Sequence, residues 1–157
     1  MLQARAVPAA VFVPTAFVGQ VNAWDGGDRP LMTAGHLRTL SGEGLELGLH
    51  SHQHENFATL SITQIADDVR ENFAAFRTLE LTPIPALAYP FGRRPQGVER
   101  EAMATALRES GVRLAFRIGN RINSLPLPDL LEINRLSVRG DESFPAFQRK
   151  VRWGRLF

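Results

Sequence analysis

Short apolar runs alternate along this chain with longer stretches of helical periodicity. The runs that suit strands are residues 9–13, 45–49, 86–89, 113–117 and, as an extended segment, 131–138. The helical patterns between them cover residues 33–42, 61–79, 96–110 and 142–151. Because this alternation is typical of strand–helix–strand units, it predicts a parallel α/β sheet or barrel.

The best-defined helix starts at Ser61, which forms a Ser-x-x-Gln capping box with Gln64. Apolar side chains then recur at helical spacing for about five turns, and Pro83 lies beyond the end. Asp67 and Asp68 fall inside this helix, where a charged pair is usually a solvated face. A later Arg-Gly-Asp tripeptide at residues 139–141 is interpreted as a turn in which the aspartate caps the last helix.

The composition is that of one ordinary globular domain, residues 1–157, with 44% hydrophobic and 22% charged residues. The net charge is only +2 and the arginines are spread along the chain, so we expect no nucleic-acid partner. With no cysteine, a metal site would have to use histidine and carboxylate ligands.

No apolar stretch approaches the roughly 18 residues of a membrane span, and the N-terminus lacks a basic segment followed by an apolar core. We therefore expect neither a membrane span nor an export signal, and a cytoplasmic location by default. The sequence does not indicate an oligomeric state.

The segment of residues 48–54 carries three of the 4 histidines directly after an apolar run. In a helix His50 and His54 would share a face at i and i+4, whereas in an extended chain His52 would join them. Both geometries bring the outer pair together, as two imidazole ligands of one metal require. The alternative interpretation is a set of polar surface residues at the end of a strand.

Residues 46–61 resemble the metal-binding motif of the polysaccharide deacetylases, also called the NodB homology domain or carbohydrate esterase family 4. In that motif, His-(Ser/Thr)-x-x-His, both outer histidines hold the metal, and here they match His50 and His54. Residues 7–14 resemble the family's second barrel strand and residues 88–92 resemble its third motif. The resemblance therefore covers nearly the whole chain.

The resemblance implies a partial, distorted (β/α) barrel of the glycoside hydrolase and deacetylase type that lacks the first strand. In the family that strand ends in Thr-Phe-Asp-Asp-Gly, whose aspartates serve as the base and the third metal ligand. This chain begins after it, so we expect an N-terminally truncated domain with impaired turnover. Asp25, in the loop after the first predicted strand, is an alternative ligand or a substrate contact.

The activity implied by the resemblance is metal-dependent hydrolysis of N-acetyl groups, which are non-peptide carbon–nitrogen amides. The expected substrate is an amino-sugar polysaccharide or glycolipid. The expected cofactor is a divalent metal, Zn²⁺ in the first place, on His50 and His54. By the same resemblance the backbone N–H of Phe91 stabilises the oxyanion, although residues 90–92 also suit a plain turn.

Three residues are predicted to bind substrate: Trp24, Tyr89 and Arg135. Trp24 would stack on a sugar ring, and Tyr89 belongs to the third motif. The family's late histidine has no match, and residues 131–141 instead resemble a variant tail in which an arginine stands nearby. An equally suitable interpretation of Arg135 is an arginine at the end of a strand that forms a salt bridge.

Two other functions compete with a deacetylase. A catalytically inactive carbohydrate-binding module would keep the aromatic surface and lack the base. A metal-dependent hydrolase acting on an unrelated small amide would keep the histidines and recognise a different substrate.

Overall fold

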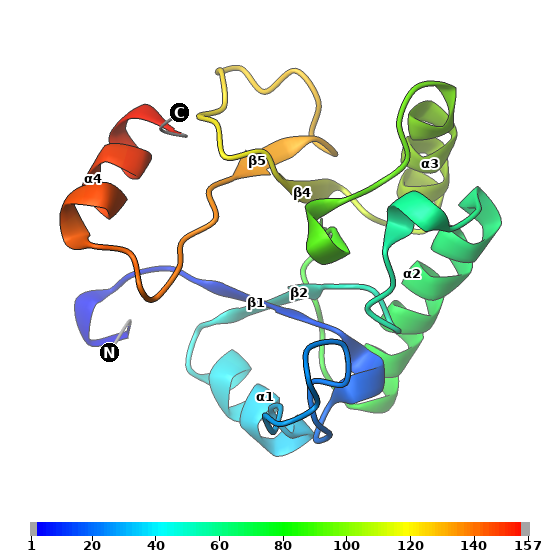
Figure 1. Cartoon of the computed structure of the whole chain (residues 1–157). Helices are drawn as coiled ribbons and strands as arrows, with labels where there is room; N and C mark the ends of the chain where they lie inside the picture. The colour runs from blue at the N-terminus through cyan, green and yellow to red at the C-terminus, as the bar shows by residue number, and fades with distance from the viewer. Residues whose placement is uncertain (1–2, 155–157) are drawn as a thin grey trace.

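The computed structural model describes residues 3–154 as a five-stranded parallel sheet. The strands follow chain order: β1 (Ala10–Val13), β2 (Glu46–Leu49), β3 (Ala86–Ala88), β4 (Leu114–Ile118) and β5 (Ile133–Arg135). Every neighbouring pair is parallel, so the carboxyl ends of all five strands share one edge. The predicted α/β class is confirmed, and over the described residues the sheet is open, with β1 and β5 at its borders (Figure 1).

Helices connect the first four strands in turn, because parallel neighbours need a crossover connection, whereas a loop joins β4 to β5. The α-helices are α1 (Ala34–Gly42), α2 (Ile62–Thr78), α3 (Val98–Glu109) and, after β5, α4 (Phe144–Trp153). Short 3₁₀ turns are η1 (Gln3–Arg5), η2 (Thr15–Phe17), η3 (Phe57–Thr59) and η4 (Pro90–Gly92). Helices α2 and α3 pack side by side, and α4 stands apart from them (Figure 1).

Helix starts follow the capping residues closely. Ser61 and Gln64 form the predicted capping box of α2, and Thr33 forms another with His36 at the start of α1. The predicted cap of the last helix is wrong. Ser143, and not Asp141, accepts the N–H of the first turn, because α4 begins later and has a proline in its first turn.

The last strand is shorter than the extended segment predicted for residues 131–138. Its neighbour β4 ends at Ile118, which pairs with Arg135. Beyond that pair the chain has no strand to continue along, so the ladder stops and a loop leads to α4.

One hydrophobic core lies between the sheet and the helices α1 to α3. Its buried sheet residues include Leu47, Leu49, Leu87 and Ala115, and its buried helix residues include Leu37, Ile65, Val69, Phe76, Met103 and Leu107. Burying such side chains stabilises the fold by roughly 1.5–3 kcal/mol each. This layer holds the strand ends, and the loops that leave them, in fixed positions.

The other face of the sheet carries an aromatic contact. Phe12 of β1 and Phe116 of β4 meet edge to face with ring centroids 5.6 Å apart. Gly48 of β2 lies beneath Phe12, and a Cβ there would stand 2.6 Å from its ring. The absent side chain of Gly48 therefore leaves the room that Phe12 fills.

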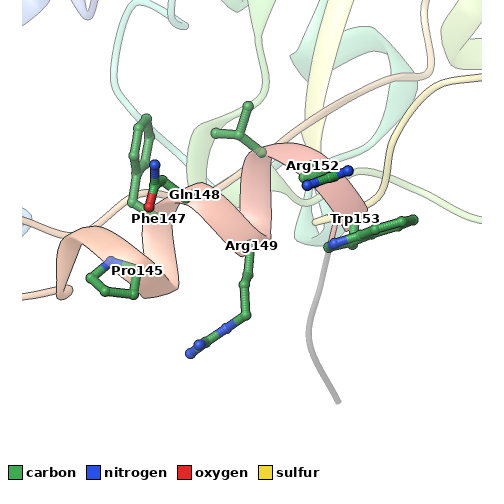
Figure 2. A pocket seen from close by; sticks show the side chains of 7 residues that line it. Pro145, Phe147, Gln148, Arg149, Arg152 and Trp153 are labelled. Carbon is green, nitrogen blue, oxygen red and sulfur yellow. The ribbon is translucent and has the colours of Figure 1, made fainter.

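Helix α4 buries none of its side chains. A shallow hollow of about 550 Å³ lies beside it, and Phe147 and Arg149 point to different sides of the helix (Figure 2). The helix is anchored by Lys150, whose Nζ donates to the carbonyl of Ser137 at 2.6 Å and pairs with Glu142. Among the described residues no helix has the length and apolar content of a membrane span.

Candidate functional site

Polar and aromatic residues gather at the carboxyl edge of the sheet. His50 directly follows β2, turn η4 follows β3 two residues on, Arg135 ends β5, and Thr15 follows β1. In parallel α/β folds this edge is where ligands bind, because loops from several strands converge there. The topology thus brings together the predicted histidine and aromatic motifs.

The imidazole of His50 is held by the neighbouring strand. Its Nδ1 lies 2.6 Å from the carbonyl oxygen of Ala88, and since a carbonyl only accepts, Nδ1 carries the proton. The lone pair of Nε2 is then directed elsewhere, as in metal-binding histidines whose other nitrogen donates to a carbonyl. Burial lowers the pKa of His50, and the charge of Arg135 lowers it further.

His54 is buried among aromatic rings. Its ring stacks on Trp24 with centroids 4.2 Å apart, and it meets His50 and Phe91 edge-on at 4.9 Å each. Within the described part of the chain, Nδ1 of His54 and Oγ of Ser51 are buried without a hydrogen-bond partner. Burial, with a smaller contribution from His50, lowers the pKa of His54 to about 4. Both imidazoles are therefore neutral at pH 7, the form that binds metal.

The loop between the two histidines is neither helical nor extended. Ser51 and His54 both have positive φ, 69° and 55°, which L-residues adopt at an energetic cost. Asp68 of α2 holds this loop: its carboxylate accepts the N–H groups of His52 and Gln53 at 3.0 Å. The expected convergence of His50 and His54 is thus reached through a sharply turned loop.

His52 faces away from the pair, toward the loop that follows β1. Its Nδ1 lies 2.9 Å from Oγ1 of Thr15. Asn72 of α2, which is fully buried, donates from Nδ2 to that hydroxyl at 2.6 Å and to the carbonyl of Val13 at 3.3 Å. His52 is therefore part of a structural network.

The interpretation of the aspartate pair as a solvated face is right for one member and wrong for the other. Asp67 is exposed and pairs with Arg70, whereas Asp68 is buried beneath the histidine loop. The signal was present in the sequence, because Asp68 and Asn72 recur at helical spacing within the apolar stripe. That stripe consists of Ile65, Val69 and Phe76.

Trp24 sits on a loop that the side chain of Asn22 organises. Asn22 is buried, donates to the carbonyl of Asp25 at 2.7 Å and accepts the N–H of Arg29 at 2.8 Å. The indole of Trp24 also meets Phe17 edge-on at 4.9 Å. One face of the indole is thus covered by His54, so Trp24 shields that imidazole and also borders the carboxyl edge of the sheet.

Turn η4 places Phe91 at the carboxyl edge of the sheet, where the residue is 48% exposed. Phe91 and Gly92 have φ of 55° and 67°, and the N–H of Gly92 is bonded to the carbonyl of Tyr89 at 2.9 Å. Gly92 is required here, because a Cβ would lie 2.5 to 2.7 Å from Ile118 of β4. The turn is therefore pressed tightly against the neighbouring strand.

Tyr89 does not lie where a substrate contact was expected. Its side chain is fully buried, and its hydroxyl donates to the carbonyl of Leu131 at 3.0 Å. Burial raises the pKa of this hydroxyl far above its usual value, so the phenol stays neutral. The structure thus places Tyr89 in the hydrophobic core, next to η4.

Arg135 reaches the site, and the salt bridge proposed as the alternative is not among the ion pairs of the described residues. Its Nε is buried without a partner, burial lowers its pKa, and its charge acts on His50. Near the start of β5, Glu132 forms ion pairs with Arg94, which follows η4, and with Arg117 of β4.

The donor set fits part of a metal site. Two neutral imidazoles meet at 4.9 Å, the tautomer of His50 is set by Ala88, and His54 has an unpartnered nitrogen. Zinc prefers such nitrogen ligands at about 2.0–2.1 Å. Residues 3–154 hold no group of three histidine, aspartate, glutamate or cysteine side chains suited to a metal, and Asp25 is exposed. The described residues thus offer two neutral imidazoles as candidate donors and no third group.

Comparison with known proteins gives a consistent assignment. The sequence profile described as polysaccharide deacetylase matches residues 1–115. No curated protein matches the sequence. Among solved structures, the Streptococcus pyogenes deacetylase PplD in complex with acetate is similar at a TM-score of 0.74 and 17% identity, with 95% of this chain and 61% of that one covered.

Two further structures share this fold. IcaB from Ammonifex degensii has a TM-score of 0.73 at 21% identity over 97% of this chain and 64% of its own. A de-N-acetylase from Aggregatibacter actinomycetemcomitans has a TM-score of 0.71 at 15% identity, with 95% and 67% covered. The chain thus spans less than two thirds of the length of the first two structures, and at these identities the likeness establishes the fold alone.

Proposed function

This chain belongs to the polysaccharide deacetylase family, and on that premise we propose that its site hydrolyses N-acetyl groups of an amino-sugar polysaccharide or glycolipid. The observation that carries the proposal is the convergence of His50 and His54 beside Trp24 and Phe91 at the carboxyl edge of the sheet. The bond broken is a non-peptide amide, so the products are acetate and a free amine on the sugar.

In this proposal His50, through Nε2, and His54 hold a divalent metal ion, with Zn²⁺ as the expected ion. A metal bound there would activate water and polarise the amide carbonyl. Support comes from the neutral state of both rings and from the Ala88 carbonyl that sets the tautomer of His50. The fixed tautomer directs one lone pair into the site without protonation at neutral pH.

The other residues bind and polarise substrate. The N–H of Phe91, on turn η4, donates to the oxyanion that forms from the amide carbonyl. Trp24 borders the space where a sugar ring would lie, and Arg135 contributes an unpartnered buried Nε and a positive charge that acts on His50. A guanidinium there favours an anionic transition state or the acetate product.

The proposal also includes slow turnover by this chain. Deprotonation of water needs a base, and neutral imidazoles that serve as metal ligands are poor candidates. The described residues place no carboxylate group with the two histidines that would complete a metal site. We therefore expect weak metal binding and low activity, relative to an enzyme whose site includes carboxylates.

A second candidate is an inactive carbohydrate-binding module. It is favoured by the aromatic surface itself, because Phe91 is half exposed and both Phe91 and Trp24 contact the ring of His54. Aromatic faces bind sugar rings without any metal. Such a module would bind N-acetylglucosamine oligomers equally well in a chelator and in Zn²⁺.

The test combines Zn²⁺ calorimetry with an assay of the acetate released from N-acetylglucosamine oligomers and of the free amines left on them. The proposal expects Zn²⁺ binding near one equivalent that is lost in a His50→Ala, His54→Ala double variant. The matched control is His36→Gln, which changes an exposed histidine of α1 and should keep Zn²⁺ binding.

Metal-dependent release of acetate, with free amines left on the oligomers, supports the deacetylase. Oligomer binding that ignores both metal and the double substitution supports the binding module. Release of acetate from small amides, with none from the oligomers, would point to the third interpretation, a small-amide hydrolase.

A further inference from the structure

Asp68 is a buried carboxylate that touches the histidine loop and none of the predicted ligands. The residue is 7% exposed, and its two oxygens lie 3.0 Å from the N–H of His52, with one also 3.0 Å from that of Gln53. Hydrogen bonds to a charged acceptor are about twice as strong as neutral ones. Burial of a carboxylate is costly unless such bonds compensate.

The loop that Asp68 holds needs an external restraint. Ser51 and His54 both occupy the left-handed region, which persists only where the surroundings over-determine the backbone. The two N–H groups bound by Asp68 belong to the residues between them. The carboxylate thus fixes the middle of the loop by hydrogen bonds, and the two ends of the loop carry His50 and His54.

A second restraint runs from the same helix to the first strand. Asn72 lies one turn after Asp68 and donates to Oγ1 of Thr15, which in turn contacts Nδ1 of His52. Backbone and side chain of His52 are therefore both engaged, the first by Asp68 and the second by Thr15. Helix α2 fixes the loop against β1 as well as β2.

We propose that Asp68 is a positioning residue: its hydrogen bonds with the His52 and Gln53 amides set the mutual orientation of the His50 and His54 imidazoles. The inference deepens the proposed function and rests on it for its meaning in metal binding. Its structural part, the ordering of the two rings by α2, stands in the metal-free protein and is tested there.

The first test is nuclear magnetic resonance of the whole chain in a chelator. Because His54 stacks 4.2 Å from Trp24, its ring protons are shifted upfield by the indole. In Asp68→Ala we expect this shift to collapse toward the random-coil value. The amides of His52 and Gln53 should exchange with solvent roughly tenfold faster or more.

Two variants separate positioning from general destabilisation. Asp68→Asn keeps one acceptor oxygen and should retain part of the His54 shift. Asp67→Ala changes the adjacent exposed carboxylate and should leave every signal in place. Core amides of α2 around Val69 must remain protected in all variants, which shows that the helix is still folded.

The second test measures Zn²⁺ affinity by calorimetry. Loss of an outer-shell contact typically weakens metal binding by roughly 10–100-fold, so Asp68→Ala should fall in that range and Asp68→Asn nearer its lower end. Asp67→Ala should bind as the unmodified chain does.

An unchanged His54 ring shift and unchanged amide exchange in Asp68→Ala would overturn the proposal. So would lost amide protection with unaltered Zn²⁺ affinity, since releasing the loop from Asp68 would then leave the two ligands oriented as before. If the unmodified chain binds no Zn²⁺, the proposed function fails, and the ring-shift measurement still decides the role of Asp68.

Discussion

Gly92 is the position where a single methyl group should do most damage to the site. It follows Phe91, the proposed oxyanion donor, and has a φ of 67°. A Cβ there would lie 2.5 and 2.6 Å from the side chain of Ile118 and 2.7 Å from its backbone nitrogen. Rotating a side chain cannot relieve the contact with the backbone, so η4 or β4 must move.

The expected loss follows from two effects. The left-handed backbone destabilises alanine by about 1–2 kcal/mol, partly offset by about 0.5 kcal/mol of unfolded-chain entropy. Overpacking against Ile118 adds roughly 1–3 kcal/mol. We therefore expect Gly92→Ala to lower the free energy of unfolding by about 2–4 kcal/mol, a large part of the roughly 5–15 kcal/mol of a typical domain.

The assay is urea unfolding followed by circular dichroism. With a slope of about 2 kcal/mol per molar urea, the midpoint should fall by about 1–2 M. The matched control is Gly27→Ala, because Gly27 has the same φ of 67° and nothing within 4 Å of its Cβ position. Its midpoint should fall by less than about 1 M. Equal midpoints for the two variants would refute the argument from the Ile118 contact.

Three further predictions concern residues at or near the carboxyl edge of the sheet. Burial lowers the pKa of His54 from 6.5 to about 4, so the unfolded chain binds more protons than the folded chain between these values. In a chelator, stability should be full above pH 6.5 and decline as pH falls toward 4. Urea midpoints of His54→Gln should show a smaller slope with pH, the remainder coming from His50, whose pKa is also lowered. Trp24→Ala uncovers the His54 ring and should raise its pKa, measured by nuclear magnetic resonance; an unchanged value would show that the indole does not desolvate the ring. Tyr89→Phe leaves the carbonyl of Leu131 unpaired and should lower the free energy of unfolding by roughly 1–2 kcal/mol, while calorimetry shows unchanged binding of N-acetylglucosamine oligomers; weaker binding would restore Tyr89 as a substrate contact.

Local patterns in the sequence predicted most of the fold. The Ser61 capping box and the helical stripe after it placed α2 within a residue, and Thr33 did the same for α1. These features succeed because a cap or an apolar face is decided by residues within a few positions. The error at Asp141 arose where two residues close in sequence, Asp141 and Ser143, both suited the same role.

Side-chain environments were predicted less well. Nothing near Tyr89 in the sequence distinguishes a buried hydroxyl bonded to Leu131 from a rim residue. Asp68 has a neighbour, Asp67, of the same chemistry and opposite exposure. The apolar stripe of α2 separates the two, but the contact of Asp68 with the amides of His52 and Gln53 depends on how distant segments pack.

By itself the sequence determined that this is a parallel α/β protein whose paired histidines follow the second strand described, because apolar periodicity and motif spacing are local properties. Only the tertiary structure decided what surrounds those histidines. Three contacts join residues that are between 15 and 38 positions apart. They are the hydrogen bond of His50 with the Ala88 carbonyl, the stacking of the Trp24 indole on His54, and the hydrogen bonds of Asp68 with the loop. Such contacts exist because parallel strands carry distant segments to one edge, where burial and hydrogen bonding select a single arrangement.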